Sequence, residues 1–589
     1  MRKRSFLALG LLLFARSVAP NSANVEGGAG RSESGRLIAD ARPADDTIGT
    51  YGGRLVVPLR SEPKTLNPVL AADNYSRDVI WRTMGDLIHI NRFTQQTESA
   101  LALSWQVSRD GRRYTLQLRP DLKFSDGHAA DADDVIFSFE VYLDAKVNSP
   151  QRDLLVVGGK PIEVRKIDAH TVEFDLSQPY GAGERIFDSI AILPRHLLEP
   201  GYRAGKFSEM WGVNARPIQI AGLGPFKLKE FVLGQRVVLE KNPYYWKQDR
   251  SGNTLPYLSE IIFVFIPSAD SEVLRFQSGD VDLETRLNAQ NFSLLGEKGA
   301  QLVDGGSSLE YSFLCFNQND LRGRSLPEVS QRQEWFAQKN FRQAVSLAID
   351  RQALVRLVYK NRAEALWGNV TPGIKLWRDA ALPAPARSLD KARELLRAAG
   401  FRISTSSDGT PVLYDSHNQP VNFTLATSSS NAERVKMAAL IQADLQELGM
   451  RVQVVPLEFR ALLDRVFQTY DYDACLMSLA SGDADPTADI NVWRSNGAQH
   501  LWHLGESKPA STWESEVDVL LDQQLITTDT AERRRVYNRV QEIIAENAPV
   551  VFLVSPHMLA AAKPGLGNFR PAVMEPPTLW NADVLYWKK

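Results

Sequence analysis

Alternating apolar and polar positions in the first half of the chain predict β-hairpins. Residues 105–118, WQVSRDGRRYTLQL, alternate on both sides of Asp110-Gly111, a pair that favours a two-residue turn. Residues 164–176, VRKIDAHTVEFDL, repeat the pattern. A short apolar run at residues 52–59, GGRLVVPL, is the first expected strand. This part of the chain is therefore expected to be rich in antiparallel sheet.

An unusual group of acidic residues lies between the two hairpins. Its members are Asp126, Asp131, Asp133 and Asp134. The sequence FSDG before them is typical of a turn, with Gly127 supplying the permissive backbone. Asp131 fits an N-cap, and the next two carboxylates fit the first turn of a helix over residues 131–143. A calcium loop needs ligands at alternating positions and a central glycine, which DGHAADADD does not supply. The pattern predicts helix initiation.

After residue 305 the periodicity changes to that of helices separated by short apolar strands. Strand 421–427, helix 432–449 and strand 450–457 form an expected β-α-β unit. The other expected helices cover residues 341–359, 388–400, 459–468, 514–526 and 531–546, and the other strands cover residues 472–480 and 550–556. A further β region is expected over residues 222–246. The second half therefore has an α/β pattern.

The N-terminus is typical of an export signal. Arg2, Lys3 and Arg4 precede SFLALGLLLFA, an apolar stretch of about eleven residues, too short to cross a bilayer. Residues 1–23 are expected to be a signal peptide and residues 24–50 a disordered spacer rich in Ala, Gly, Ser and Asp. The alternative for the apolar stretch is a short buried helix. No cysteine lies near it to carry a lipid, and no later run reaches about 18 apolar residues.

Composition and charge narrow the possible partners. The 589 residues include 68 basic and 70 acidic side chains, giving a formal net charge of −2. This balance provides no long-range field for a nucleic acid or an anionic membrane. The two cysteines, Cys315 and Cys475, both lie in apolar strand-like runs. Two buried free thiols are favoured over a disulfide.

Familiar catalytic and cofactor motifs are missing from the sequence. SEPK at residues 61–64 matches a serine-x-x-lysine pattern, but Pro63 disfavours the helix that this pattern needs. GLGPFK fails the dinucleotide pattern because Lys227 occupies the position of its third glycine. His500 and His503 could share a helix face, but nothing in the sequence adds further metal ligands. We expect no catalytic residue, no metal and no cofactor, although a hydrolase with an unrecognised carboxylate pair stays open.

The stretch LASGDADPTADINVW, residues 479–493, is the best candidate for a binding loop. It begins at the carboxyl end of an expected strand, where open α/β sheets usually bind ligands. Ala480, Ser481 and Gly482 permit close backbone approach, and Asp483 offers acceptor oxygens. The alternative is a capped turn before a helix. Local features leave both interpretations open.

Several segments then occur in an order typical of one family. They are YGGRLVVPLRSEPKTLNPVLA (51–71), residues 101–140, GLGPFKL (222–228), LEKNPYYW (239–246), LPYLSEIIF (255–263), SGDVDL (278–283), FRQAVSLAIDRQALV (341–355) and residues 532–554. Together the chain resembles the extracellular solute-binding proteins of the peptide/nickel class (family 5) that serve ABC importers. The resemblance extends from about residue 52 to 585.

The resemblance implies an α/β, bilobal periplasmic-binding-protein fold (type II, cluster C-like) with an extra inserted α+β domain. Lobe I would combine residues 51–92, 217–308 and 556–589, the inserted domain would be residues 93–216, and lobe II would be residues 309–555. The chain would cross between the lobes near residues 308–317 and 550–556. The aspartate group would then lie in the inserted domain, away from the ligand.

The resemblance also implies a binding site between the lobes. Peptide-binding members place a tryptophan and an aspartate before an acidic residue and a proline, and the aspartate holds the peptide's α-ammonium group. Aligned on Pro486, these positions hold Leu479 and Gly482, with Asp483 one step away. The full expected site is Asp73, Asn74, Tyr75, Leu479, Ala480, Ser481, Gly482, Asp483 and Trp493, the last either a stacking surface or core. Other members bind sugars, nickel chelates or opines.

The implied function is that of a periplasmic substrate-binding protein. It would close on an oligopeptide or similar small organic solute and deliver it to a membrane permease, acting as a monomer without catalysis. Ligand favours closure only through its higher affinity for the closed state. Two alternatives remain: a secreted hydrolase on the same scaffold, and a sensor that presents its ligand to a receptor.

Overall fold

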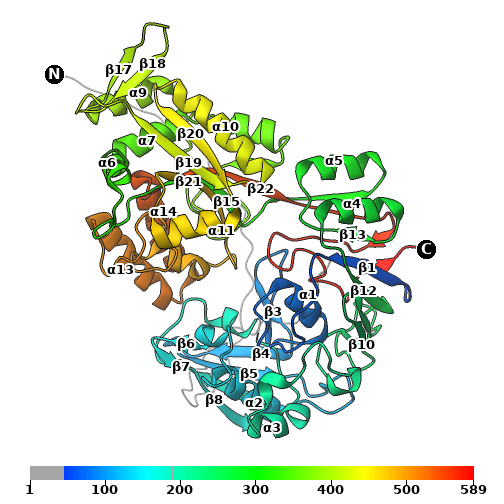
Figure 1. Cartoon of the computed structure of the whole chain (residues 1–589). Helices are drawn as coiled ribbons and strands as arrows, with labels where there is room; N and C mark the ends of the chain where they lie inside the picture. Colours follow the sequence, from blue (N-terminus) through cyan, green and yellow to red (C-terminus); the bar gives the residue numbers. More distant parts are fainter. Residues whose placement is uncertain (1–45, 189) are drawn as a thin grey trace, which may run out of the picture.

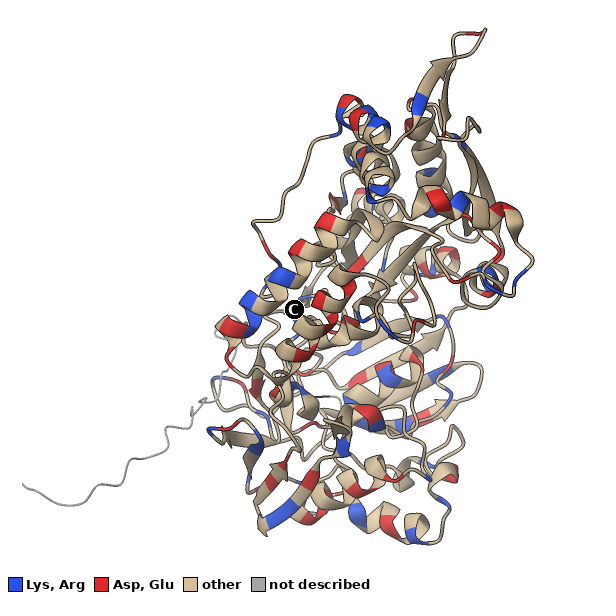
Figure 2. Ribbon diagram, turned by 90° about the vertical axis from the view of Figure 1, so that its left-hand side faces the viewer, with Lys and Arg blue, Asp and Glu red and all other residues tan. Residues whose placement is uncertain are grey.

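The computed structural model describes residues 46–188 and 190–589 (Figure 1). The expected signal peptide, and the expected spacer as far as residue 45, lie outside the described residues. Among the helices of the two described stretches, none combines the length and apolar character needed to cross a bilayer. Basic and acidic residues are intermixed along the helices seen in Figure 2.

A small mixed sheet lies near the C-terminus of the chain (Figure 1). Its strands, in order, are β1 (Arg54–Leu59), β12 (Glu260–Phe265), β11 (Arg236–Lys241) and β10 (Phe226–Val232). β1 pairs with β12 in parallel, whereas the other two pairs are antiparallel. Alternate residues of β1, Leu55, Val57 and Leu59, are buried in the core, as period-2 patterning requires. The predicted strand at 52–59 and β region at 222–246 are confirmed.

A second, antiparallel sheet contains the predicted hairpins. Its strands, in order, are β4 (Ala102–Val107), β5 (Arg113–Leu118), β9 (Thr171–Asp175) and β8 (Glu163–Asp168). Helix α2 (Ala132–Leu143) follows the aspartate group. Asp131 accepts from the Asp133 amide, and Asp134 reaches back to the Asp131 amide. Helix initiation, the role predicted for these carboxylates, is confirmed.

The largest sheet combines strands from residues 283–307 with strands from residues 310–562. Its strands are β13 (Leu283–Glu284), β22 (Val550–Ala562), β15 (Glu310–Phe316), β21 (Ala474–Ala480), β19 (Asn422–Ser428) and β20 (Arg451–Leu457), with β14 (Gln301–Ser307) and β16 (Ala363–Ala365) also paired to β22. β22 pairs with β15 through residues 550–554 and with β14 through residues 557–562. The 13-residue strand β22 therefore pairs with strands from both of these segments.

Helices cover both faces of this sheet. α7 (Lys339–Ala348), α9 (Leu389–Ala398) and α10 (Ala432–Gln446) pack on one face, and α13 (Thr512–Ile526) and α14 (Thr530–Asn547) pack on the other. Neighbouring residues of β15 point to opposite cores, Leu314 to the first and Phe313 to the second. β19, α10 and the parallel strand β20 form the predicted β-α-β unit.

The remaining helices and strands are shorter or peripheral. The helices are α1 (Asn74–Thr83), α3 (Arg195–Arg203), α4 (Ala269–Ser278), α5 (Ala289–Glu297), α6 (Pro327–Phe336), α8 (Arg351–Ala353), α11 (Phe459–Asp464) and α12 (Ile490–Trp493). The two-stranded sheets are β2 (Ile88–Ile90) with β3 (Thr97–Ser99), β6 (Val156–Val157) with β7 (Lys160–Pro161), β17 (Arg402–Thr405) with β18 (Pro411–Tyr414), and β23 (Leu566–Gly567) with β24 (Tyr586–Trp587).

One predicted helix is broken. A continuous helix was expected over residues 341–359, but α7 ends at Ala348, and Ile349 has extended backbone angles. Asp350 then caps α8 by accepting from the Ala353 amide. The break turns Arg351 inward, where its Nε donates to the Phe552 carbonyl at 2.9 Å. Helical periodicity did not reveal this buried polar contact.

The two cysteines lie directly opposite each other on adjacent strands. Cys315 of β15 is the register partner of Cys475 of β21. Both are buried and both are free thiols, which was the favoured interpretation of the sequence. Hydrogen bonding with Cys475 and burial raise the pKa of the Cys315 thiol well above 9.0, so it stays protonated at neutral pH.

Candidate functional site

A cavity of about 730 Å³ lies between segments that flank or follow three different sheets. Four stretches supply most of its lining: residues 74–92, 180–191, 480–488 and 574–583. The first and last belong with the small mixed sheet, the second follows the hairpin sheet, and the third follows β21 of the large sheet. We call this cavity the chamber. Segments that flank or follow three different sheets therefore line the chamber.

The end of strand β21 gives the chamber one of its walls. Ala480, Ser481, Gly482 and Asp483 all line it. A Cβ atom built on Gly482 would meet nothing within 4 Å, so open space lies in front of this residue. Asp485 accepts from the Thr487 amide and caps the 3-10 helix Pro486–Asp489. The loop thus lines the chamber and also contains the capped turn that was the alternative to a binding loop; the binding interpretation stays a prediction.

An ion pair joins this wall to the stretch after the hairpin sheet. Arg185, in the 3-10 helix Gly183–Phe187, donates from Nε to Asp483 Oδ2 at 2.7 Å, and its Nη2 contacts Oδ1. The two side chains are 15% and 26% exposed. Burial alone would lower the pKa of the Arg185 guanidinium, but pairing with Asp483 raises it above its ordinary value. Arg185 therefore carries its charge at any physiological pH.

A deeper ion pair supports the same contact. Arg533 of α14 donates to both oxygens of Asp485 at 2.6 and 2.8 Å, and the two side chains are each 3% exposed. Arg533 also donates to the Gly181 carbonyl at 3.0 Å. A Cβ atom on Gly181 would lie 2.5 Å from the Thr527 carbonyl oxygen. Only glycine permits this close approach of two backbones.

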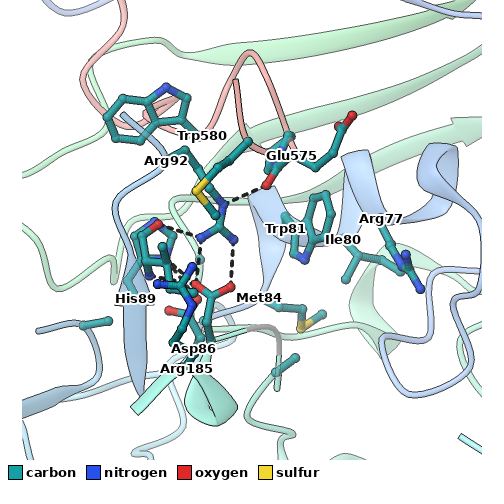
Figure 3. A pocket seen from close by; sticks show the side chains of 18 of the residues that line it. Arg77, Ile80, Trp81, Met84, Asp86, His89, Arg92, Arg185, Glu575 and Trp580 are labelled. Atoms are coloured by element: carbon teal, nitrogen blue, oxygen red, sulfur yellow. Dashed lines mark hydrogen bonds and ion pairs between the residues drawn. The ribbon is translucent and has the colours of Figure 1, made fainter. Parts of the chain in front are cut away.

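The opposite wall contains a group of interlocking charges. Arg92 donates to both oxygens of Asp188 at 2.9 Å and to the Glu575 carbonyl at 2.7 Å. His89 lies 3.0 Å from Asp86, and Figure 3 shows both beside Arg92. Burial favours protonation of Asp188, but Arg92 and His89 hold the pKa of its carboxyl below 3.8. Arg92 and Asp188 are therefore both charged and paired at neutral pH.

Part of this network has the composition of a metal site. Single ligand atoms of Asp86, His89 and Asp188 lie within 4.8 Å of one another. However, the Arg92 guanidinium already occupies the Asp188 carboxylate, and a metal ion would have to displace that cation. The geometry therefore favours a charged binding surface over a metal centre here.

Aromatic and aliphatic side chains complete the chamber. Ile80, Trp81 and Met84 come from α1 and the residue after it, and Trp580 of the C-terminal segment lies on the other side of Arg92 in Figure 3. Trp246 also lines the cavity. Apolar surface with a few fixed polar groups is the usual composition of a small-molecule binding pocket.

The residues that the sequence led us to expect in the binding site have the following positions in the structure. Asn74, Ala480, Ser481, Gly482 and Asp483 line the chamber. Asp73 is the N-cap of α1 and accepts from the Ser76 amide at 2.9 Å and from its hydroxyl at 2.7 Å. Tyr75 and Leu479 pack against the hydrophobic cores and are outside the chamber lining. Trp493 is 3% exposed, with its ring 5.9 Å from that of Trp502.

Sequence reasoning missed most of the charged wall. Arg92, Arg185 and Asp188 are separate charges in stretches that carry no familiar motif. A usable signal was present in YGAGERIFDSIAILP, residues 180–194, where single charges interrupt an apolar run rich in small residues. Charges in such a setting are seldom left buried without partners.

Comparison with known proteins agrees with this architecture. Residues 96–500 match the family model described as bacterial extracellular solute-binding proteins, family 5 Middle. The oligopeptide-binding protein AppA of Bacillus subtilis (strain 168) is 26% identical over 526 residues, covering 88% of this chain and 89% of AppA. The crystal structure of the substrate-binding protein CtaP from Listeria monocytogenes superposes with a TM-score of 0.74 at 22% identity, covering 92% of this chain and all of CtaP.

A third similarity is to the solved structure of AppA from Bacillus subtilis in complex with a nonapeptide. Its TM-score is 0.67 at 24% identity, covering 92% of this chain and all of that one. These structural matches place the chain in the bilobal periplasmic-binding-protein fold, as the sequence predicted. The family model covers well over half of the residues. The chain belongs to family 5 of the bacterial extracellular solute-binding proteins.

Proposed function

We propose that this protein is the periplasmic substrate-binding component of an ABC importer. It captures a short peptide or a similar small organic solute in the chamber and passes it unaltered to a membrane permease. The observation that carries the proposal is the chamber itself. Arg185 and Asp483 form an ion pair, come from distant parts of the chain, and both line the chamber. A solute bound there would be enclosed by parts of the chain that are joined across the cavity mainly through side chains.

The proposed moving parts follow the strand connections. Lobe I comprises residues 51–92, 217–308 and 556–589, the inserted domain residues 93–216, and lobe II residues 309–555. Only β22 and the β14–β15 connection cross between the lobes in this division. Small backbone changes near residues 308 and 556 would then open the chamber, as in other hinge closures. This division is supported by the change of partner along β22.

The proposed ligand class rests on the chamber's lining. Its volume of about 730 Å³ lies within the range of roughly 300–1,000 Å³ found for small-ligand pockets. Cationic Arg92 and Arg185 alternate with anionic Asp188 and Asp483, next to tryptophan surfaces. Such a surface complements a solute that has both charges and apolar groups, as a short peptide does. The nonapeptide complex of AppA supports the same class.

The proposed site residues are those that line the chamber. Asn74 and the loop Ala480–Asp483 were anticipated, and Arg92 and Arg185 are added from the structure. Asp483 would receive a ligand ammonium group only by sharing its carboxylate with Arg185. We therefore assign Asp483 first to closure and second to ligand contact.

Two other functions give distinguishable results. A secreted hydrolase would change its ligand, and a sensor would bind it without any need of a permease. The missing catalytic motifs and the family membership both favour transport without chemistry. We propose that the protein acts as a monomer and reaches the periplasm through its N-terminal signal.

Native mass spectrometry of the purified protein tests this function. We expect a complex heavier than the mature chain by the mass of one solute, which is released intact on denaturation. The released solute, or a defined mixture of short peptides, is then incubated with the protein overnight. Unchanged masses support binding, whereas cleavage products support the hydrolase. Uptake that persists after deletion of the partner permease would support the sensor.

A further inference from the structure

A second group of titratable side chains lies away from the chamber, in the loop after α12 and in the first turn of α13. Single ligand atoms of His500, Glu506 and Glu514 lie within 4.8 Å of one another. Their side chains are 0%, 5% and 6% exposed. None of the three lines the chamber. We call these three residues the HEE cluster.

The tautomer of His500 makes the arrangement unusual. His500 Nδ1 lies 3.3 Å from the Val492 carbonyl oxygen, which can only accept, so Nδ1 carries a proton. Nε2 then faces two carboxylates, Glu506 and Glu514, each at 3.6 Å. A neutral imidazole would direct its lone pair at these anions. An imidazolium would place its proton beyond hydrogen-bond distance of either.

Glu506 is poorly partnered: the Ala510 backbone amide approaches its carboxylate, but no well-oriented hydrogen bond reaches either oxygen among the described residues. Both of its carboxylate oxygens and His500 Nε2 are buried without a hydrogen bond there. The Nδ1 atom of His503 lies 3.0 Å from Glu506 Oε1, but its orientation does not form a hydrogen bond. The Glu506 side chain is only 5% exposed, so its carboxylate is shielded from water. Unpaired buried carboxylates of this kind are costly and therefore rare.

The distances suit a bound cation. Zinc bonds to imidazole nitrogen and carboxylate oxygen are about 2.0–2.2 Å, so tetrahedral ligands lie about 3.4 Å apart. The 3.6 Å separations around His500 Nε2 are close to this value. We propose that the HEE cluster is a binding site for one divalent transition-metal ion of the zinc type. Its protein ligands are His500 Nε2 and the carboxylates of Glu506 and Glu514.

Surrounding contacts hold two of the proposed ligands in place. The Val492 carbonyl fixes the His500 ring, as backbone carbonyls commonly do for metal-bound histidines. Trp502 Nε1 and the Ser511 hydroxyl donate to Glu514 at 3.2 and 2.7 Å. The Trp502 ring centroid lies 3.9 Å from that of His500, which makes this tryptophan a reporter of the site.

The proposed role is structural. A metal ion here would tie the loop after α12 to the first turn of α13, on the face of the large sheet opposite α10. His500 and His503 alone gave no metal prediction from sequence. The fold adds Glu506 and Glu514, so the ligand set depends on tertiary structure. The inference is independent of which solute occupies the chamber.

Zinc binding by the purified full-length protein tests the proposal. Protein treated with a chelator is dialysed against Zn²⁺, and bound metal is counted by elemental mass spectrometry. We expect one Zn²⁺ per chain, a higher melting temperature with Zn²⁺, and quenching of tryptophan fluorescence when Co²⁺ replaces it. In Glu506→Gln we expect at least tenfold weaker binding and no thermal response to Zn²⁺. The metal-free variant should melt no lower than the metal-free wild type, because the substitution removes an unpaired buried acid.

Two controls separate the HEE cluster from other histidines. His196→Gln breaks a pair with Asp126 outside the cluster, and His89→Gln disrupts the group on the chamber wall. Both variants should keep the wild-type zinc stoichiometry. Less than 0.1 Zn²⁺ per wild-type chain, unchanged affinity in Glu506→Gln, or loss of zinc only in His89→Gln would each overturn the proposal.

Discussion

Arg185 and Asp483 hold opposite sides of the chamber together. The Arg185 Nε donates to Asp483 Oδ2 at 2.7 Å, although the two residues are 298 positions apart in sequence. Both side chains are mostly buried, so solvent screens their attraction only in part. Because the pair joins the inserted domain to lobe II in the proposed division, it would exist only while those parts are in contact. The ion pair would therefore stabilise the closed form and not the open form.

The first prediction concerns this pair. We expect Asp483→Ala and Arg185→Gln each to weaken solute binding about tenfold, equivalent to about 1.4 kcal/mol. The effects should be non-additive, with a coupling energy of about 1 kcal/mol in a double-mutant cycle measured by calorimetry. Because the two side chains would be separated and solvated in the open, solute-free form, its free energy of unfolding should stay within about 0.5 kcal/mol of wild type. Arg113→Gln, which breaks an exposed pair with Asp175, is the control. Wild-type affinity in Asp483→Ala would refute the assignment.

The second prediction uses the open space in front of Gly482. A leucine side chain there has room within the chamber and would occupy the position of a bound solute. We expect Gly482→Leu to lower affinity at least 100-fold without changing the melting temperature of the solute-free protein. Gly212→Leu is a matched control, since a Cβ atom on Gly212 also meets nothing within 4 Å and the residue does not line the chamber. Unimpaired binding by Gly482→Leu would place the solute elsewhere.

The third prediction concerns the buried Arg533–Asp485 pair. Removing the carboxylate in Asp485→Ala leaves the guanidinium buried without its counter-charge, which costs about 3–5 kcal/mol. We expect a loss of stability of this size in urea unfolding monitored by circular dichroism. The comparison is Asp390→Ala, whose carboxylate is 90% exposed and lies in the first turn of α9, with an expected change below about 1 kcal/mol. Equal effects of the two substitutions would contradict the role of burial.

The fourth prediction is a pH dependence from Glu284 of β13. This side chain is 1% exposed, and its Oε1 has no hydrogen-bond partner among the described residues. Burial and the nearby Glu272 raise the pKa of its carboxyl from 4.5 to about 8. Between these values the unfolded chain releases the proton that the folded chain retains, so folding loses stability as pH rises.

Glu284→Gln removes this titration. We expect the variant to gain stability over wild type as pH rises, reaching on the order of 4 kcal/mol near pH 8 and vanishing near pH 4.5. Melting temperatures across pH 4–8.5 measure the difference. The exposed substitution Glu297→Gln should follow the wild-type curve throughout. A stability gain in Glu284→Gln that does not vary with pH would exclude the carboxyl as its source.

Local patterns were enough to predict much of the fold. Asp110-Gly111 and the flanking alternation identified the β4–β5 hairpin, and Asp131 identified the start of α2. A tight hairpin and a helix cap both depend on residues that are close in sequence. The β-α-β unit was predictable for the same reason. The broken helix after Ala348 was not, because the contact that turns Arg351 inward is with a distant strand.

From local sequence features, the chamber lining was predictable only where it follows a strand, whereas Asn74 was anticipated from the family resemblance. The loop Ala480–Gly482 could be found because strand ends and small residues are visible in sequence. Arg185 and Arg92 could not, since their partners come from other parts of the chain. Trp493, for which stacking on a ligand and core packing were both open, lies against Trp502 in the core. Aromatic residues after a strand carry too little local information to separate these roles.

Small-angle X-ray scattering tests the central claim most directly. Protein stripped of captured solute by unfolding and refolding is measured alone, and then with the solute identified by mass spectrometry. We predict a smaller radius of gyration with solute for the wild-type protein and no change for Gly482→Leu. The same radius of gyration with and without a solute that is shown to bind would contradict a chamber that closes on its ligand.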